Sequence, residues 1–99
     1  MKYLGYFSEM NLYEDSGPLS ENIIEEVSYD KEKVIKYLLS QKRIAGCPKK
    51  TIDCGTTEVI ANSFSVYSDG EYEWCDFLPY HIRKYNIKLP QDFIAKVNN

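Results

Sequence analysis

Long apolar segments are missing from this sequence of 99 residues. A transmembrane helix needs about 20 consecutive apolar residues, and a secretory signal peptide needs an apolar core near its N-terminus. Neither pattern occurs, because Met1–Phe7 contains one lysine and no long apolar stretch follows it. We therefore expect a soluble, cytoplasmic protein without membrane contact. The length fits one domain, 1–99.

The sequence is also poor in the residues that build metal and phosphate sites. It has three cysteines and one histidine, without a CxxC pair or a Gly-rich phosphate loop. We therefore expect neither a metal ion nor a cofactor. The odd cysteine count argues against the disulfide framework of a secreted protein. We expect Cys47, Cys54 and Cys75 to be reduced, although a Cys47–Cys54 disulfide is geometrically possible.

Charge is abundant but unevenly distributed along the chain. Residues 1–32 contain eight acidic and two basic residues, and residues 33–57 contain six basic and one acidic residue. The remaining residues, 58–99, contain six acidic and four basic ones. An acidic first third repels nucleic acid and attracts a basic partner, although most such runs form only a solvated face.

Hydrophobic periodicity predicts an α+β fold, a small antiparallel β-sheet covered on one side by helices. Asp30 is placed as the N-cap of the clearest helix, which should run to about Lys42. The buried face of this helix should consist of Val34, Ile35, Leu38 and Leu39. A shorter helix after Ser20 should carry Glu21, Glu25 and Glu26. Two further helices are expected over 76–86 and 90–97.

A β-hairpin is expected near 58–75, with its turn at 68–70. A three-residue loop with Gly70 in the left-handed conformation would place Phe64 opposite Trp74 and separate apolar from polar side chains. Trp74 would then face the core. The open face of the hairpin would carry Tyr67, Glu71 and Glu73.

Three arrangements of residues bear on chemistry or nucleic-acid binding. Glu71 and Glu73 are spaced like the two carboxylates of a glycosidase, but the sequence supplies no pocket around them. His81 is at helical spacing with Leu78, which is more typical of a core or boundary histidine than of an acid–base catalyst. A basic loop over 42–50 could bind nucleic acid, but the protein is acidic overall, with a pI near 5.1.

Three sequence pieces follow one another in the second half of the chain. They are a D-G-x-x-x-W turn over 69–74, a helix with paired aromatics over 78–85, and an L-P-x-x-F segment over 89–93. In this order they resemble small bacterial immunity proteins of polymorphic toxin systems, including contact-dependent growth inhibition. The resemblance extends over about 30–97.

The resemblance implies a non-enzymatic immunity protein that binds the C-terminal domain of one cognate toxin and covers its active site. Because most such toxins are nucleases, the partner would be basic, and acidic side chains would take the place of phosphates; the protein itself would bind no nucleic acid. The candidate contact residues are Glu71, Glu73, Tyr67 and Asp69, with Glu21, Glu25 and Glu26 as a second set. The alternative is a small enzyme or nucleic-acid-associated regulator that uses His81 and the basic loop over 42–50.

Overall fold

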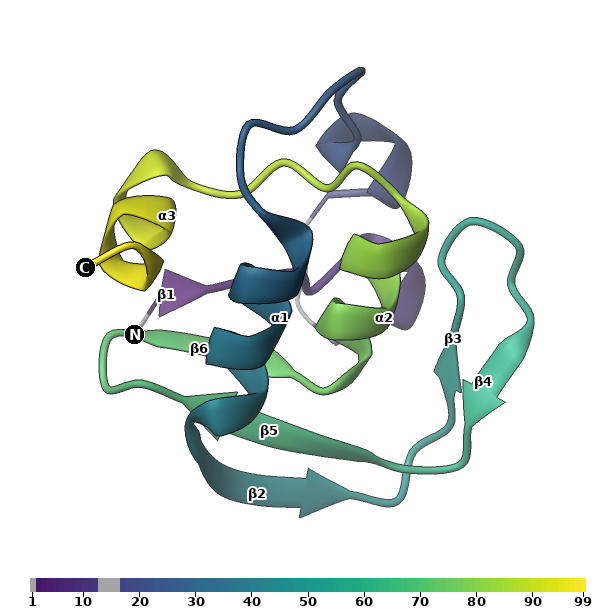
Figure 1. Cartoon of the computed structure of the whole chain (residues 1–99). Coiled ribbons are helices and arrows are strands. Elements are labelled where there is room, and N and C mark those ends of the chain that lie inside the picture. The colour runs from purple at the N-terminus through teal and green to yellow at the C-terminus, as the bar shows by residue number, and fades with distance from the viewer. Residues whose placement is uncertain (1, 13–16) are drawn as a thin grey trace.

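The computed structural model describes residues 2–12 and 17–99, and Figure 1 shows their arrangement. The elements in chain order are β1 (Lys2–Tyr3), η1 (Ser8–Met10), η2 (Leu19–Asn22), α1 (Lys31–Ser40), β2 (Lys42–Cys47), β3 (Thr51–Ile52), β4 (Val59–Ala61), β5 (Phe64–Ser68), β6 (Tyr72–Cys75), α2 (Phe77–Lys84) and α3 (Gln91–Val97), where η denotes a 3₁₀ helix. This combination of helices and sheets confirms the α+β class.

The main sheet has four strands in the order β1-β6-β5-β2, and β3 pairs with β4 in a separate two-stranded sheet. Strands β2, β5 and β6 pair antiparallel, and β5 with β6 forms the expected hairpin. The sheet is mixed rather than purely antiparallel, because β1 runs parallel to β6. The N–H groups of Lys2 and Leu4 donate to the carbonyls of Glu71 and Glu73 at 3.0 and 2.9 Å.

The register of the hairpin differs from the predicted one. Tyr67 lies opposite Trp74, and Ser68 lies opposite Glu73, so the predicted pairing of Phe64 with Trp74 is wrong. Opposite residues of an antiparallel pair share a face, and successive residues alternate between faces. Tyr67 therefore shares the face of Trp74, whereas Glu73 points to the other side of the sheet.

The side chain of Asp69 explains the different register. Its Oδ1 accepts the backbone N–H groups of Glu71 and Tyr72 at 2.9 and 2.8 Å. Gly70 has the expected positive φ, 97°. These bonds place the turn over 69–72, where the N–H of Asp69 also donates to the carbonyl of Tyr72 at 3.3 Å, in place of the predicted turn at 68–70. The hydrophobic pattern of the strands does not predict this register, because the side chain of a turn residue determines it.

Helix α1 begins as predicted, because Oδ1 of Asp30 accepts the N–H of Lys33 at 3.2 Å. The helix ends at Ser40 because the chain then enters β2, where a basic loop was predicted over 42–50. That prediction was wrong for 42–47, since β5 supplies a pairing partner that local sequence does not reveal. Leu39 was expected to be buried but is 51% exposed.

The predicted helix after Ser20 is also absent. A single 3₁₀ turn, η2, follows Pro18 and ends at Asn22. The chain then bonds to a distant segment: the N–H of Ile24 donates to the carbonyl of Asn86 at 2.9 Å, and that of Lys88 to the carbonyl of Asn22 at 2.7 Å. These long-range bonds within the chain use the backbone groups that a continuing helix would need.

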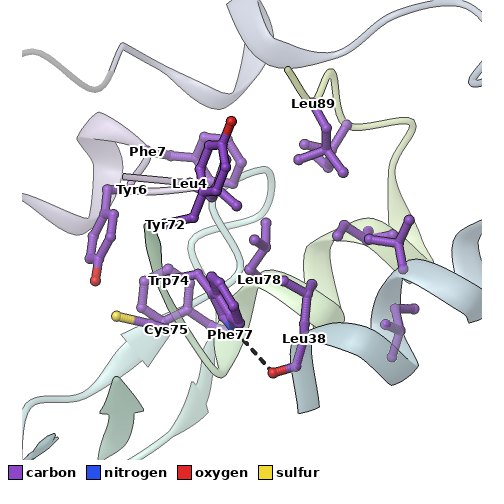
Figure 2. Close-up of a cluster of buried hydrophobic side chains, with 14 of the residues drawn as sticks. Leu4, Tyr6, Phe7, Leu38, Tyr72, Trp74, Cys75, Phe77, Leu78 and Leu89 are labelled. Carbon is purple, nitrogen blue, oxygen red and sulfur yellow. Dashed lines mark hydrogen bonds between the residues drawn. The ribbon is translucent and has the colours of Figure 1, made fainter. Parts of the chain in front are cut away.

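The core lies between the sheet and the helices, and Figure 2 shows part of it. Trp74 is completely buried, as predicted, and its Nε1–H donates to the carbonyl of Leu38 in α1 at 3.2 Å. Phe93 anchors α3, which begins after Pro90 as predicted. Its ring centroid lies 5.1 Å from that of Tyr72 and 6.1 Å from that of Trp74. Aromatic packing therefore joins β6 to α3, and the hydrogen bond from Trp74 joins β6 to α1.

We expect Phe93→Ala to lower the free energy of unfolding by about 3–5 kcal/mol, because it leaves a cavity beneath α3. Leu39→Ala is the matched control and should lower it by less than about 1 kcal/mol, because Leu39 is already in water. Urea unfolding followed by the fluorescence of Trp74 measures both. Equal losses in the two variants would contradict this description of the core.

Candidate functional site

Asp69, one of the predicted contact residues, has a side chain that is buried within the hairpin turn. Its side chain is 2% exposed, its Oδ2 accepts the hydroxyl of Tyr37 at 2.6 Å, and Nζ of Lys96 lies 3.1 Å from the same oxygen. Burial acts to raise the pKa of Asp69, but the hydrogen bonds from Tyr37, the N–H groups of Tyr72 and Glu71, and Lys96 outweigh it and lower the pKa to about 2. Asp69 is therefore an ionised, buried carboxylate whose charge is balanced by Lys96.

Glu71 is half exposed and lies between two lysines. Its Oε1 is 3.2 Å from Nζ of Lys96, and its Oε2 is 3.3 Å from Nζ of Lys2. Hydrogen bonds from Lys96 and Lys2 lower the pKa of Glu71. The ammonium groups of Lys2 and Lys96 also lie over the ring of Tyr72, at 5.3 and 5.8 Å from its centroid, respectively. Glu71 thus connects β1 and α3 to the hairpin.

Glu73 and Tyr67 do not lie together on an open face. Glu73 accepts the hydroxyl of Tyr6 at 2.7 Å on one side of the sheet. Tyr67 lies on the opposite side, across from Trp74, and is partly buried against the core. The predicted grouping of Glu71, Glu73 and Tyr67 on one surface is therefore wrong, because it depended on the hairpin register.

The second predicted set forms a different kind of surface. Glu21, Glu25 and Glu26 are all exposed. Among the described residues, none of the three has a basic nitrogen within ion-pair distance. We call residues 21–26 the acidic segment. Ile23, within it, is 40% exposed, so an apolar side chain lies among the carboxylates.

The backbone of the acidic segment is fixed by the chain that follows α2. Besides the two bonds between 22–24 and 86–88, Nδ2 of Asn86 donates to the carbonyl of Glu25 at 2.9 Å. Tyr29, just beyond the segment, donates its hydroxyl to the carbonyl of Ile87 at 2.5 Å. The carboxylates are therefore presented on an ordered scaffold although the segment is not a helix.

His81 is a buried structural residue. Its Nδ1 lies 2.8 Å from the carbonyl of Phe77, and its Nε2 accepts the N–H of Cys54 at 3.0 Å. Only the neutral ring with its proton on Nδ1 satisfies both contacts, and burial lowers the pKa of His81. With both nitrogens occupied by backbone groups, His81 offers neither a proton nor a lone pair to a substrate.

A buried carboxylate that sequence reasoning missed lies close by. Asp53 is fully buried, and its carboxylate accepts from Nζ of Lys84 at 2.6 Å and from the hydroxyls of Tyr80 and Tyr85 at 2.7 and 2.6 Å. The N–H groups of Gly55 and Thr56 donate to it at 2.8 and 3.2 Å. Burial acts to raise the pKa of Asp53, but these donors outweigh it and lower the pKa.

The Asp53 contacts hold the β3–β4 hairpin against α2, as the arrangement in Figure 1 illustrates. The sequence signals were an Asp-x-Gly-Thr turn and the i, i+4 spacing of Tyr80 and Lys84 on one helix face. Nothing in the sequence pairs the turn with the helix.

A groove of about 470 Å³ lies between this hairpin and the start of α2. It is lined by Thr51, Ile60, Ala61, Asp76, Phe77 and Tyr80. Asp76, the residue before α2, does not cap this helix with its side chain; its Oδ2 accepts the N–H of Ser65 at 3.1 Å.

The cysteines are free thiols, as expected, and Cys54 and Cys75 are buried. Burial raises the pKa of each to about 12, which keeps both protonated and unreactive. Within residues 2–12 and 17–99, no group of three or more His, Cys, Asp or Glu side chains is placed to hold a metal ion. In the same residues, no helix is long and apolar enough to span a bilayer.

No protein-family model, curated protein or solved structure matches the chain. Its function is therefore inferred from the chain's own residues and their geometry.

We expect Asp53→Asn to lower the free energy of unfolding by about 3 kcal/mol, because the buried site loses its ion pair with Lys84 and the amide group cannot accept from every remaining donor. Glu58→Gln, at an exposed residue of the same hairpin, should change it by less than about 0.5 kcal/mol. Chemical denaturation at pH 7 measures both. A similar effect of the two substitutions would show that Asp53 does not hold the hairpin.

Asp69 should make stability pH-dependent. Because its folded-state pKa of about 2 lies below the unfolded value of about 3.9, the carboxylate stabilises the fold above about pH 4, and this is lost as the pH falls toward 2. Asp69→Asn should therefore be less stable than the natural protein by about 2 kcal/mol at pH 6, and the difference should shrink toward pH 2. Urea unfolding of both proteins across this range gives the result. A difference that is independent of pH would refute the assignment.

Proposed function

We propose that this chain is a non-enzymatic immunity protein that binds a basic bacterial toxin domain, most simply a nuclease, and blocks its active site. The sequence pieces over 69–74, 78–85 and 89–93 support the class, since they resemble such proteins. The observation that carries the mechanism is the acidic segment, whose three glutamates have no basic partner within the described residues.

The internal pairing of the other carboxylates supports the choice of this surface. Asp69 and Glu71 already have lysine partners, so a basic toxin would have to compete with intramolecular cations for them. Within residues 2–12 and 17–99, no lysine or arginine competes in this way for Glu21, Glu25 and Glu26. Exposed and unpaired carboxylates retain their full attraction for an approaching cation, apart from screening by salt.

The ordered backbone of the acidic segment supports binding in a second way. A surface that is already held in place loses less conformational entropy on association than a mobile one. The carboxylates would accelerate encounter and reject acidic partners, while the exposed Ile23 would supply apolar contact at the centre. A nuclease cleft that is shaped for phosphates would accept the carboxylates in their place.

This proposal places the protein in the cytoplasm, where an incoming nuclease meets its substrates. It assigns no catalytic role to His81, whose ring nitrogens both contact the backbone. The protection would be stoichiometric, one immunity protein for each toxin molecule, because the mechanism is occlusion.

The test uses the toxin domain encoded immediately upstream of the gene. We expect Glu25→Lys/Glu26→Lys to slow association with it about tenfold or more at low ionic strength and to reduce the protection of cells that express the toxin. Glu58→Lys/Asp92→Lys is the matched control, because it changes the net charge equally at exposed residues elsewhere. Stopped-flow or surface-based kinetics at several salt concentrations measure the association rate.

Equal association rates for the two double variants would refute the role of the acidic segment. An upstream gene whose product is harmless to cells, or turnover of RNA or nucleotides by the purified protein, would refute the proposed function itself.

A further inference from the structure

The groove beside the start of α2 is a second feature suited to a partner. Thr51, Ile60 and Ala61 form one wall, from β3 and β4, and Phe77 and Tyr80 of α2 belong to the other. Its volume of about 470 Å³ lies within the range of about 300–1,000 Å³ that is usual for ligand pockets. The walls are mostly apolar side chains.

Asp76 gives this apolar groove one negative charge. The only hydrogen bond to its carboxylate within the described residues comes from the N–H of Ser65, and no basic nitrogen among them lies within ion-pair distance. The buried carboxylates Asp53 and Asp69 differ, because each has a lysine. The helix dipole places about half a positive charge at the start of α2, which leaves the groove net negative.

We propose that the groove binds an arginine side chain of the protein partner. Its aliphatic part would pack against Ile60 and Phe77, and its guanidinium group would meet the carboxylate of Asp76. The ring of Tyr80 supplies an aromatic wall on which a guanidinium group can stack. The identity of the partner as a basic toxin domain rests on the proposed function, but the chemistry of the groove does not.

Other occupants fit the groove less well. An anionic group would be repelled by Asp76, and a purely apolar side chain would cover a carboxylate without giving it a cation. A lysine ammonium group is more strongly hydrated than a guanidinium group and cannot bond bidentately. The combination of apolar walls, one unpaired carboxylate and one aromatic ring therefore favours arginine.

The experiment uses the full-length, ¹⁵N-labelled protein without any toxin. N-acetyl-arginine amide is titrated while amide chemical shifts are recorded, and N-acetyl-citrulline amide serves as the neutral probe of the same shape. We expect saturable shifts at the groove residues, with a dissociation constant on the order of millimolar for arginine. Binding of the citrulline probe should be at least about fivefold weaker, since it lacks the ion pair.

Matched variants locate the site. Asp76→Asn keeps an oxygen for the N–H of Ser65 and should abolish the preference for arginine over citrulline. Ala61→Phe, at an exposed residue of the groove, should weaken arginine binding by about tenfold by filling the space. Val59→Phe, on the same strand but outside the groove, should leave binding within about twofold. If Asp76→Asn fails to fold, the loss of arginine binding expected in Ala61→Phe still tests the location of the site.

Equal binding of the two probes, shifts confined to the acidic segment, or no saturable shift would overturn the arginine site. Because no toxin is present, these results are independent of the proposed function. A third outcome is that arginine binds but Glu25→Lys/Glu26→Lys still associates normally with the upstream gene product. This result would support the arginine site in the groove and refute the role of the acidic segment.

Discussion

The hydrogen bonds made by one carboxylate, that of Asp69, determine much of this structure. By accepting from the N–H groups of Glu71 and Tyr72, Asp69 sets the position of the hairpin turn and therefore the register of β5 against β6. That register places Trp74 and Tyr67 on the helix side of the sheet. The other oxygen of Asp69 binds Tyr37 and Lys96, so the same residue links α1 and α3 to the turn.

The same register decides which acidic residues remain for a partner. With a three-residue loop, Glu71 and Glu73 would lie on an open face beside Tyr67. With the observed turn at 69–72, Glu71 lies between Lys2 and Lys96, and Glu73 accepts a hydrogen bond from Tyr6. The carboxylates of the hairpin therefore mostly form ion pairs and hydrogen bonds within the protein. Charge counted from the sequence indicates an attraction for basic partners, but pairing within the fold determines where that attraction is available.

Local signals in the sequence were sufficient for much of the fold. Asp30 capped α1, Pro90 preceded α3, and Trp74 and Phe93 entered the core, because each depends on neighbouring residues or on hydrophobic periodicity. The two acidic sets could be named from charge alone. Charge alone could not predict which glutamates are ion-paired within the fold, because lysines distant in sequence pair with some of them.

Apart from the hairpin register, which the local bonds of Asp69 set, the incorrect predictions came from interactions between residues far apart in sequence. Strand β2 exists because β5 pairs with it, and the acidic segment is not a helix because residues 86–88 take its backbone hydrogen bonds. Asp53 finds its donors Tyr80, Lys84 and Tyr85 between 27 and 32 residues further along the chain. Such contacts are consequences of the tertiary fold, and no periodicity in the sequence encodes them.

Helix α2 connects the two proposed contact regions. The groove lies at its first turn, and residues 86–88, which hold the acidic segment, follow its last turn. Eight residues of helix span about 12 Å, which is shorter than the width of a partner interface of ordinary size. The cations between them do not oppose a basic partner fully, because Arg83 pairs with Glu32 and Lys84 with Asp53. The helix that Asp53 anchors therefore joins the two proposed contact regions.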